Sequence, residues 1–250
     1  PKPIWAERGF EHDGETAWDN LRNETAGWQN SEPLSMYLHL PFCPKRCRFC
    51  DCYAVVPPAH RRSQMEALFT RVLLQEIDAW AQIPGLADRK VTTVHFGGGT
   101  PDGLEPSLFA SIVEACRRSF AVTAATEWAL ESPVRLLDEA HLCRLRQLGF
   151  IRIHSGVQTL EESLRRRIGR QDSPGLVLER LVRAMEMGFV VSVDLVYGLP
   201  GQTIAGFTQT IRQLTEIGIH GLSLYRFNRS RRNREVWECD PYPSGDRLLE

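Results

Sequence analysis

The feature that most constrains the fold of this chain is a regular alternation of short apolar strands with amphipathic helices. Six strand-like segments occupy residues 36–40, 91–96, 126–130, 150–157, 189–197 and 221–227. Segments with helical periodicity separate them, and strands that alternate with helices in this way form a parallel sheet joined by right-handed crossovers. The chain is therefore predicted to be an α/β protein whose functional groups lie on loops at the carboxyl ends of the strands.

The helices are predicted from the three-and-four spacing of their apolar residues. The first is expected to bury one face, formed by Met65, Leu68, Phe69, Val72, Leu73 and Ile77. Cys116 and Cys143 fall in later helical patterns and are expected to be plain buried thiols. Because a closed barrel of this type has eight strand–helix units, the alternatives here are an open partial barrel and an open doubly wound sheet.

Four cysteines follow the first predicted strand within a single loop: Cys43, Cys47, Cys50 and Cys52. In a chain of this size, thiols packed so closely indicate a metal site rather than a disulfide framework. Four thiolates can hold a structural zinc ion, although zinc sites usually take cysteine pairs from two separated segments. Three thiolates from one loop can instead hold three irons of a [4Fe–4S] cluster and leave the fourth iron open to a small molecule.

The spacing Cys-x3-Cys-x2-Cys, with Phe49 before the last cysteine, resembles the signature of the radical S-adenosylmethionine (SAM) enzymes. The segment Tyr37-Leu-His-Leu-Pro-Phe-Cys43 narrows the resemblance to the HemN-like branch, which includes oxygen-independent coproporphyrinogen III oxidase. The resemblance covers residues 36–227 and implies a partial (β/α)6 barrel with parallel strands. It also implies that Cys43, Cys47 and Cys50 hold a [4Fe–4S] cluster and that one or two SAM molecules bind beside it.

A glycine run follows the second strand directly, in the sequence Gly97-Gly98-Gly99-Thr100-Pro101. On its own the run predicts a tight turn. The resemblance implies that its bare backbone approaches the methionine amino group of SAM, where side chains would block the contact. Glu131 and Gln158 lie at the ends of the third and fourth strands, and the resemblance implies that both bind the ribose hydroxyls of SAM.

Three further positions in the second half of the chain also resemble the family. Arg170 corresponds to an arginine that pairs with the SAM carboxylate, whereas the arginines at 165–167 are expected to form a solvent-exposed face. Asp194 lies inside an apolar strand, where an unpaired charge is costly, so a hydroxyl or amine of the cofactor is expected to satisfy it. Tyr225, in the sixth strand, resembles a residue that lines the adenine.

The two ends of the chain lack the strand–helix pattern. Residues 1–35 contain Trp5, Trp18 and Trp28 and are expected to form an extension anchored on the barrel by these tryptophans. A lid over the active site is the alternative for this segment. Residues 228–250 are interpreted as the start of a C-terminal region that is truncated or missing, which in this family covers the active site.

The net charge and the number of cysteines indicate which binding partners and which cellular compartment to expect. The net charge of −1 gives no reason to expect binding to nucleic acid or to an anionic membrane. The sequence has no apolar run long enough to span a membrane and no signal-peptide pattern at its start. Seven cysteines, an odd number, suit a reducing compartment, so the protein is expected to be cytoplasmic.

Membership of the family implies that an electron from a donor such as flavodoxin or ferredoxin reaches the cluster and cleaves SAM to a 5′-deoxyadenosyl radical. That radical takes a hydrogen atom from a small-molecule substrate, a tetrapyrrole or another unsaturated or heteroaromatic compound. Three reactions and one non-catalytic role fit this resemblance. The reactions are HemN-like methyl transfer, oxidative decarboxylation as in coproporphyrinogen oxidase, and a heme-utilisation reaction; the non-catalytic role is that of a HemW-like heme chaperone.

Two departures favour a HemN-like methyltransferase over a coproporphyrinogen oxidase. The chain has Glu131-Ser132-Pro133 at the end of the third strand, and the sixth strand ends in Tyr225-Arg-Phe-Asn-Arg229. Cys52 argues against the chaperone, because the oxidases have this extra cysteine. Cys52 is either a small buried residue or, with Tyr37 near the cluster, a catalytic residue beside the second SAM or the substrate.

Overall fold

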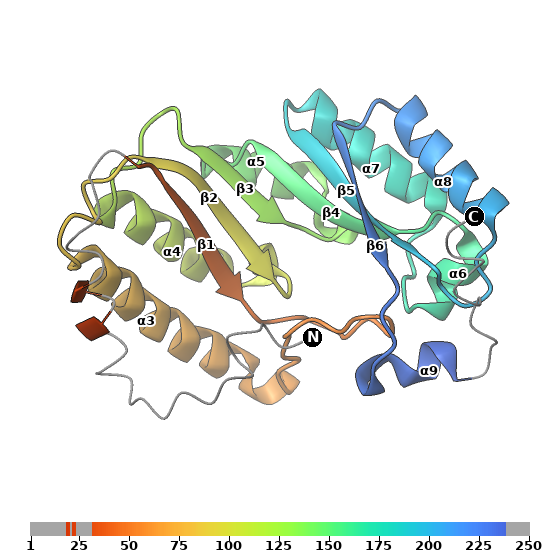
Figure 1. The fold of residues 1–250 in the computed structure, drawn as a ribbon, viewed down its shortest axis with the longest axis horizontal. Coiled ribbons are helices and arrows are strands. Elements are labelled where there is room, and N and C mark those ends of the chain that lie inside the picture. The colour runs from red at the N-terminus through yellow and green to blue at the C-terminus, as the bar shows by residue number, and fades with distance from the viewer. Residues whose placement is uncertain (1–18, 21, 24–31, 239–250) are drawn as a thin grey trace.

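The computed structural model describes residues 19–20, 22–23 and 32–238 of the 250-residue chain. Its centre is a parallel sheet of six strands in the order β1-β2-β3-β4-β5-β6 (Figure 1). The strands are β1 (Leu34–Leu40), β2 (Val91–Gly98), β3 (Glu127–Glu131), β4 (Arg152–Gln158), β5 (Val190–Tyr197) and β6 (Gly221–Arg226). Because each right-handed crossover moves the chain to the next strand in the same direction, the helices are placed on one face of the sheet. The prediction of an open partial barrel is confirmed, and the doubly wound alternative, in which helices cover both faces, is wrong.

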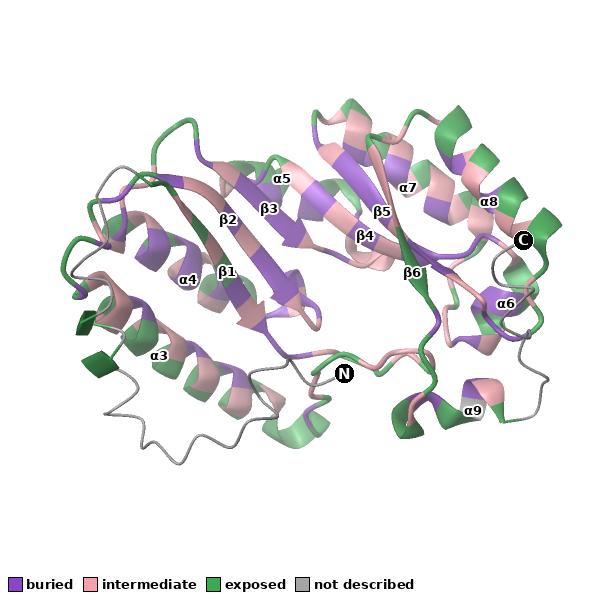
Figure 2. Ribbon diagram, in the orientation of Figure 1, coloured by how far each residue is buried: buried purple, intermediate pink, exposed green. Residues whose placement is uncertain are grey.

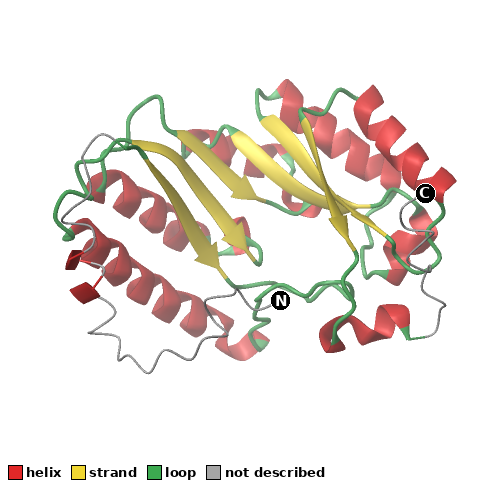
Figure 3. Ribbon diagram, in the orientation of Figure 1, coloured by secondary structure: helices red, strands yellow, loops and turns green. Residues whose placement is uncertain are grey.

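The helices that follow the strands are α3 (Arg62–Ala81), α4 (Pro106–Ser119), α5 (Glu139–Gln147), α6 (Glu162–Arg167), α7 (Pro174–Glu186), α8 (Ile204–Glu216) and α9 (Arg234–Trp237) (Figure 3). Single 3-10 turns lie at η1 (Ala59–Arg61), η2 (Pro101–Gly103), η3 (Val134–Leu136) and η4 (Arg231–Asn233). Capping residues begin several of these helices. The side chains of Asp138, Ser173 and Thr203 each accept a hydrogen bond from a backbone N–H in the first turn of α5, α7 and α8. None of the described helices is long and apolar enough to cross a membrane.

The strands alternate between apolar and polar residues, which is unusual for a parallel sheet. Parallel strands covered by helices on both faces are apolar throughout. In β1 to β5, residues at alternate positions, such as Leu38, Phe96, Leu130, Ile153 and Val193, enter the buried core between the sheet and the helices. Figure 2 shows the buried colour recurring along these strands. The residues between these buried positions face away from that core. The second face of the sheet is therefore a polar surface without covering helices, as a partial barrel requires.

Three predictions about burial are wrong. Leu68 and Val72 of α3 are each 51% exposed, because this helix lies at the end of the helix layer and packs through Phe69 and Ile77. Cys143 is exposed, because α5 turns its neighbours Leu142 and Leu145 toward the core. Cys116 is buried, as expected.

Arg165 is also contrary to expectation, because it is only 2% exposed instead of lying on a solvated face. Its guanidinium donates to the carbonyl oxygens of Val157 at 3.0 Å, Thr159 at 2.8 Å and Asp172 at 2.9 Å. Satisfied in this way, the buried arginine ties the end of β4 to the segment after α6.

The two predicted terminal segments are only partly described. β1 begins at Leu34, so the last two residues of the expected extension belong to the sheet. Trp5, Trp18 and Trp28 lie outside the described residues. At the other end, residues 231–237 form η4 and α9, which pack beside the cysteine loop, and Cys239 is again outside the described part.

Candidate cluster and cofactor site

The polar face of the sheet carries several of the predicted site residues. It is formed by the alternate strand positions Tyr37, His39, His95, Gly97, Glu131, Arg152, His154, Gly156, Asp194, Ser223 and Tyr225. The register sets Gly97 level with His39 and Glu131 level with His154. Since all six strands are parallel, their carboxyl ends meet at one edge, where the cysteine loop also begins.

The cysteine loop leaves β1 and folds back on itself. The N–H of Cys43 donates to the carbonyl of Val55 at 2.8 Å, and the N–H of Val55 donates to Pro41 at 2.7 Å. The hydroxyl of Thr100 lies 3.7 Å from the sulfur of Cys43 as a hydrogen-bond donor. Burial raises the pKa of the Cys43 thiol, and the bond from Thr100 opposes that rise. Cys43, Cys47 and Cys50 are all partly exposed.

Cys50 and Cys52 interact directly through their thiols. The hydrogen bond from Cys52 lowers the pKa of Cys50 to about 6, and the same bond raises the pKa of Cys52. Of these two thiols, Cys50 is therefore the one that loses its proton more readily. Cys52 is exposed, so the expectation of a small buried residue is wrong. The catalytic interpretation of Cys52 stays a prediction.

The far side of the loop is held by residues that the sequence did not point to. The N–H of Arg48 donates to the carbonyl of Ile168 at 3.1 Å, and the side chain of Asn233 donates to the carbonyl of Phe49 at 3.1 Å. Phe49 packs against a small apolar cluster of Ile168, Val196, Leu199, Phe227 and Val236. The loop between the cysteines is therefore anchored to α6 and to the segment after β6.

The glycine run is shaped by the cysteine loop beside it. Gly99 donates to the carbonyl of Leu40 and Thr100 to that of Phe42, both at 2.8 Å. A Cβ atom at Gly99 would lie 2.6 Å from the Phe42 carbonyl oxygen, which leaves no space for a side chain. Gly98 has a φ of +114°, which favours glycine. These glycines thus allow two loops to meet as well as leaving bare backbone toward the polar face.

Glu131 is held close to the glycine run. Its carboxylate accepts the N–H of Gly98 at 3.1 Å and lies 3.7 Å from Nε2 of His95. A Cβ atom at Gly97 would lie 2.6 Å from the same carboxylate. Because Gly97 has no side chain, there is room beside it for the Glu131 carboxylate.

Gln158 and Arg170 converge at Gly156. A Cβ atom at Gly156 would lie 2.5 Å from Nε2 of Gln158 and 3.3 Å from a guanidinium nitrogen of Arg170. Gln158 has a φ of +70° at an irregularity in the β4–β5 register, an unusual conformation for a residue other than glycine. Nε of Arg170 is buried and has no hydrogen-bond partner among the described residues, and its guanidinium lies over the ring of Phe49, 5.7 Å from the centroid. Within the described part of the chain, Nε of Arg170 therefore remains available to a bound ligand.

Asp194 and Tyr225 lie on the polar face of β5 and β6. Burial, followed by the charge of Glu131, raises the pKa of Asp194 to about 6, and Ser223 opposes the rise through a hydrogen bond. The charge of Asp194 in turn raises the pKa of Tyr225, which is exposed. Asp194 therefore stands on the open polar face rather than inside the apolar core.

A row of aromatic and imidazole rings crosses the same face from Tyr37. Tyr37 stacks on His95 at a centroid distance of 5.7 Å, and His95 lies 5.2 Å from His154. Burial raises the pKa of Tyr37 to about 12, whereas burial and the charges of His95 and Arg152 lower the pKa of His154. Neither His95 nor His154 was predicted as a site residue, although the alternation of residues along their strands places both on this face.

The residues present fit the expected [4Fe–4S] cluster and SAM. Among the described residues, no three His, Cys, Asp or Glu side chains converge on a point that suits one metal ion. A cubane cluster takes each thiolate on a different iron, so the three sulfurs of one loop need no such convergence. The unpartnered Nε of Arg170 and the bare backbone at Gly97 lie near the loop and suit a carboxylate and an amine, respectively.

Comparisons with known proteins agree with this arrangement. Residues 37–214 match the family model of the radical SAM superfamily. Oxygen-independent coproporphyrinogen III oxidase of Salmonella typhimurium is 33% identical over 196 residues, which are 78% of this chain and 42% of that protein. The enzyme of the same name from Bradyrhizobium diazoefficiens is 36% identical over 195 residues, 75% of this chain and 42% of the relative.

The fold gives the same result. The solved structure of coproporphyrinogen III oxidase (HemN) from Escherichia coli matches with a TM-score of 0.81 and 29% identity, over 95% of this chain and 54% of that one. The chain thus spans about half the length of the relatives that it matches. By its sequence and its fold, this chain belongs to the radical SAM superfamily, in the HemN-like branch.

Proposed function

We propose that this chain is the catalytic barrel of a radical SAM enzyme that oxidises a tetrapyrrole, as an oxygen-independent coproporphyrinogen III oxidase does. The observation that carries the proposal is the match to oxidases of that name over three quarters of the chain, with a third of the residues identical. This match favours oxidative decarboxylation over the methyl transfer expected from the departures at Ser132 and after Tyr225.

Proteins of this superfamily use a [4Fe–4S] cluster and SAM, which together supply a 5′-deoxyadenosyl radical able to remove a hydrogen atom. In the proposal, Cys43, Cys47 and Cys50 hold the cluster. The polar edge of the sheet then orients SAM. Arg170 pairs with its carboxylate, and the backbone of Gly97, Gly98, Gly99 and Thr100 meets its amino group.

The remaining contacts of the proposal lie along the same edge. Glu131 and Gln158 receive the ribose hydroxyls, Asp194 receives a further donor, and Tyr225 lines the adenine. The substrate meets Tyr37 and Cys52, the proposed catalytic residues, at the side of the cluster. A soluble one-electron donor such as flavodoxin or ferredoxin reduces the cluster, in keeping with a cytoplasmic enzyme.

The experiment that tests the proposal is anaerobic reconstitution with iron and sulfide, followed by reduction and addition of SAM with coproporphyrinogen III. We expect a low-temperature EPR signal that shifts with SAM, formation of 5′-deoxyadenosine, and a porphyrinogen product lighter by the mass of a carboxyl group and one hydrogen. The C47A variant is the control, because it should take up little iron and form no 5′-deoxyadenosine.

Two results would contradict the proposal. S-adenosylhomocysteine together with a product heavier by a methyl group would establish methyl transfer instead. Binding of zinc in place of iron, with no SAM-dependent EPR signal, would overturn the radical SAM chemistry as a whole.

A further inference from the structure

The backbone pairing of β3 with its two neighbours stops where the proposed SAM contacts begin. The paired register of β2 with β3 ends at Phe96 and Leu130, and that of β3 with β4 ends at Glu131 and His154. Gly97 and the residues after it therefore lie beyond the last β2–β3 pair. Between the β2 and β3 segments, the direct bond from the Gly98 N–H to the Glu131 carboxylate is then supplemented by side-chain contacts beyond the strand pairs.

A network of buried hydrogen bonds made by side chains connects the carboxyl-terminal parts of β2, β3 and β4. The hydroxyl of Ser132 donates to Oδ2 of Asp102 at 2.5 Å, and the hydroxyl of Ser155 donates to the carbonyl of Ser132 at 2.8 Å. The N–H of Ser132 also donates to the carbonyl of His154 at 2.9 Å. Asp102, Ser132 and Ser155 are all buried. These hydrogen bonds thus join the segment after β2 to the segment after β3 and to β4.

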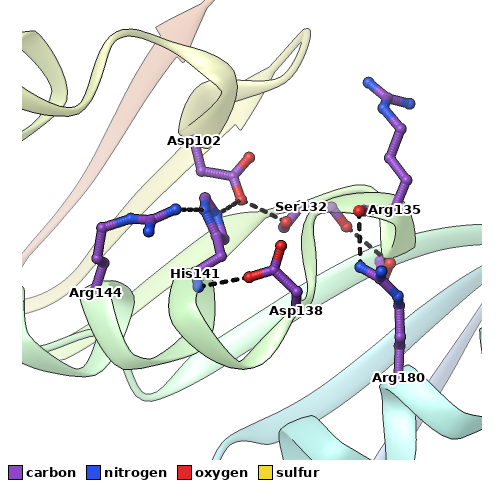
Figure 4. A network of polar contacts seen from close by, with 8 residues as sticks. Asp102, Ser132, Arg135, Asp138, His141, Arg144 and Arg180 are labelled. Atoms are coloured by element: carbon purple, nitrogen blue, oxygen red, sulfur yellow. Dashed lines mark hydrogen bonds and ion pairs between the residues drawn. The ribbon is translucent and has the colours of Figure 1, made fainter.

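His141 and Arg144 of α5 complete the network from the helix side (Figure 4). Nε2 of His141 lies 2.8 Å from Oδ2 of Asp102, and Nδ1 lies 3.0 Å from a guanidinium nitrogen of Arg144. A guanidinium can only donate, so Nδ1 must accept, and the proton of a neutral imidazole is on Nε2. The imidazole of His141 therefore lies between the positively charged guanidinium of Arg144 and the buried carboxylate of Asp102.

Three members of this network each lie within three residues in sequence of a residue assigned to SAM. Asp102 follows Thr100 and Pro101, Ser132 follows Glu131, and Ser155 precedes Gly156, where Gln158 and Arg170 converge. A shift of Asp102 relative to Ser132 would thus change the distance between the glycine run and Glu131. None of the three network residues lies on the polar face itself.

We propose that Asp102 is a positioning residue for SAM, and that its bonds to Ser132 and His141 hold the glycine run and Glu131 at the spacing that the cofactor requires. The inference rests on the proposed function only in that SAM binds at these strand ends. Stability is a poor explanation for the network, because burying a carboxylate is costly and no described residue forms a hydrogen bond with Oδ1 of Asp102. A network that fixes the geometry of a binding site has a function that offsets this energetic cost.

The chain offers a matched control at the opposite end of the same two strands. The hydroxyl of Thr126, which precedes β3, donates to the carbonyl of Val91 at the start of β2 at 2.7 Å. Thr126 is buried as Ser132 is. T126V and S132A therefore each remove one buried hydroxyl that joins the β2 segment to the β3 segment, far from SAM in one case and beside it in the other.

The experiment compares wild type, S132A, S132T, D102A and T126V as reconstituted proteins with equal iron content. SAM dissociation constants are measured without substrate, from the SAM-dependent EPR change and by equilibrium dialysis, together with the Tm of each variant. We expect S132A to weaken SAM binding about tenfold and D102A more, because small misplacements of positioning groups have large effects. S132T, which keeps the hydroxyl, should restore binding, and T126V should change it less than about twofold while lowering Tm.

The inference is overturned if S132A binds SAM as wild type does, or if T126V weakens SAM binding as much as S132A at a similar loss of Tm. Failure of the proposed tetrapyrrole reaction leaves this comparison intact, since no substrate enters it. A wild-type protein that binds iron but no SAM overturns both.

Discussion

Two glycines at the carboxyl end of β2 have different neighbours and therefore different tolerance for a side chain. The Cβ of an alanine at Gly99 would meet the backbone of Phe42 and Pro41 within 2.8 Å. At Gly97 it would meet the ends of two side chains, the Glu131 carboxylate and the Tyr37 hydroxyl, within 2.7 Å. Neither glycine has a positive φ, so the constraint at both is space rather than backbone conformation.

The G99A variant should consequently lose more stability than G97A. At Gly99 the backbone of the cysteine loop must move, and overpacking of this kind costs about 1–3 kcal/mol. We expect G99A to show a lower Tm and reduced iron content after reconstitution. G97A should keep both but bind SAM more weakly, because Glu131 is displaced. Equal iron contents with equal Tm values in the two variants would contradict this account of the glycine run.

At the scale of elements, the segment after β6 supports the cysteine loop. α9 has four residues and is too short to be stable alone. Asn233 holds the segment together: its side chain donates to Phe49 and Asn228 and accepts from the N–H of Ser230 at 2.9 Å and from the indole of Trp237 at 3.1 Å. One buried side chain thus joins the end of the sheet to the loop that carries the proposed cluster ligands.

Replacement of Asn233 by alanine should loosen that loop. Several buried partners would lose their hydrogen bonds, including the carbonyl of Phe49, at a cost of about 1–3 kcal/mol. We expect N233A to take up less iron and to lose its cluster faster in the presence of a chelator. S230A is the control, since it removes the cap that the Ser230 hydroxyl provides to the N–H of Arg232 and to the backbone of Asn233 but leaves the Asn233 side chain in place. Cluster retention in N233A equal to that in S230A would show that the segment does not support the loop.

At the scale of the whole molecule, the open face of the sheet gathers acidic and imidazole groups whose charges interact. Asp194 shows the effect, because burial and the charge of Glu131 raise its pKa from 3.8 to about 6. Between these two pH values the unfolded chain has lost the proton that the folded chain still holds. Stability therefore falls as pH rises through this window, and the full penalty is present above the folded pKa.

D194N should accordingly be more stable than wild type at neutral pH. With allowance for solvent screening we expect a gain on the order of 1–2 kcal/mol above about pH 7, shrinking toward about pH 5 as wild-type Asp194 takes up its proton. Urea unfolding of the cluster-free protein across this range measures the difference. A gain that is independent of pH would show that Asp194 ionises at its ordinary pKa.

The fold was predictable because its signals are local. Periods of two in strands such as 36–40 and 150–157, and periods of three to four between them, specify the order of elements without knowledge of any contact. The cysteine spacing and the residues at the strand ends were predictable for the same reason. Strand starts differed by one or two residues at β1, β3, β4 and β5, where pairing with a neighbouring strand decides the boundary.

Side-chain surroundings were not predictable, because they join residues far apart in the chain. Nothing near Arg165 or Cys143 in the sequence shows that the first is buried among carbonyl groups and the second exposed. The bond between Asp102 and Ser132 and the bond between Asn233 and Phe49 exist only once the strands are assembled. The sequence by itself determined the six-stranded parallel sheet and the loop of cysteines, since both are written in local spacing. Only the tertiary structure decided how the strand ends are held at the distances a cofactor needs, because that depends on which distant side chains meet.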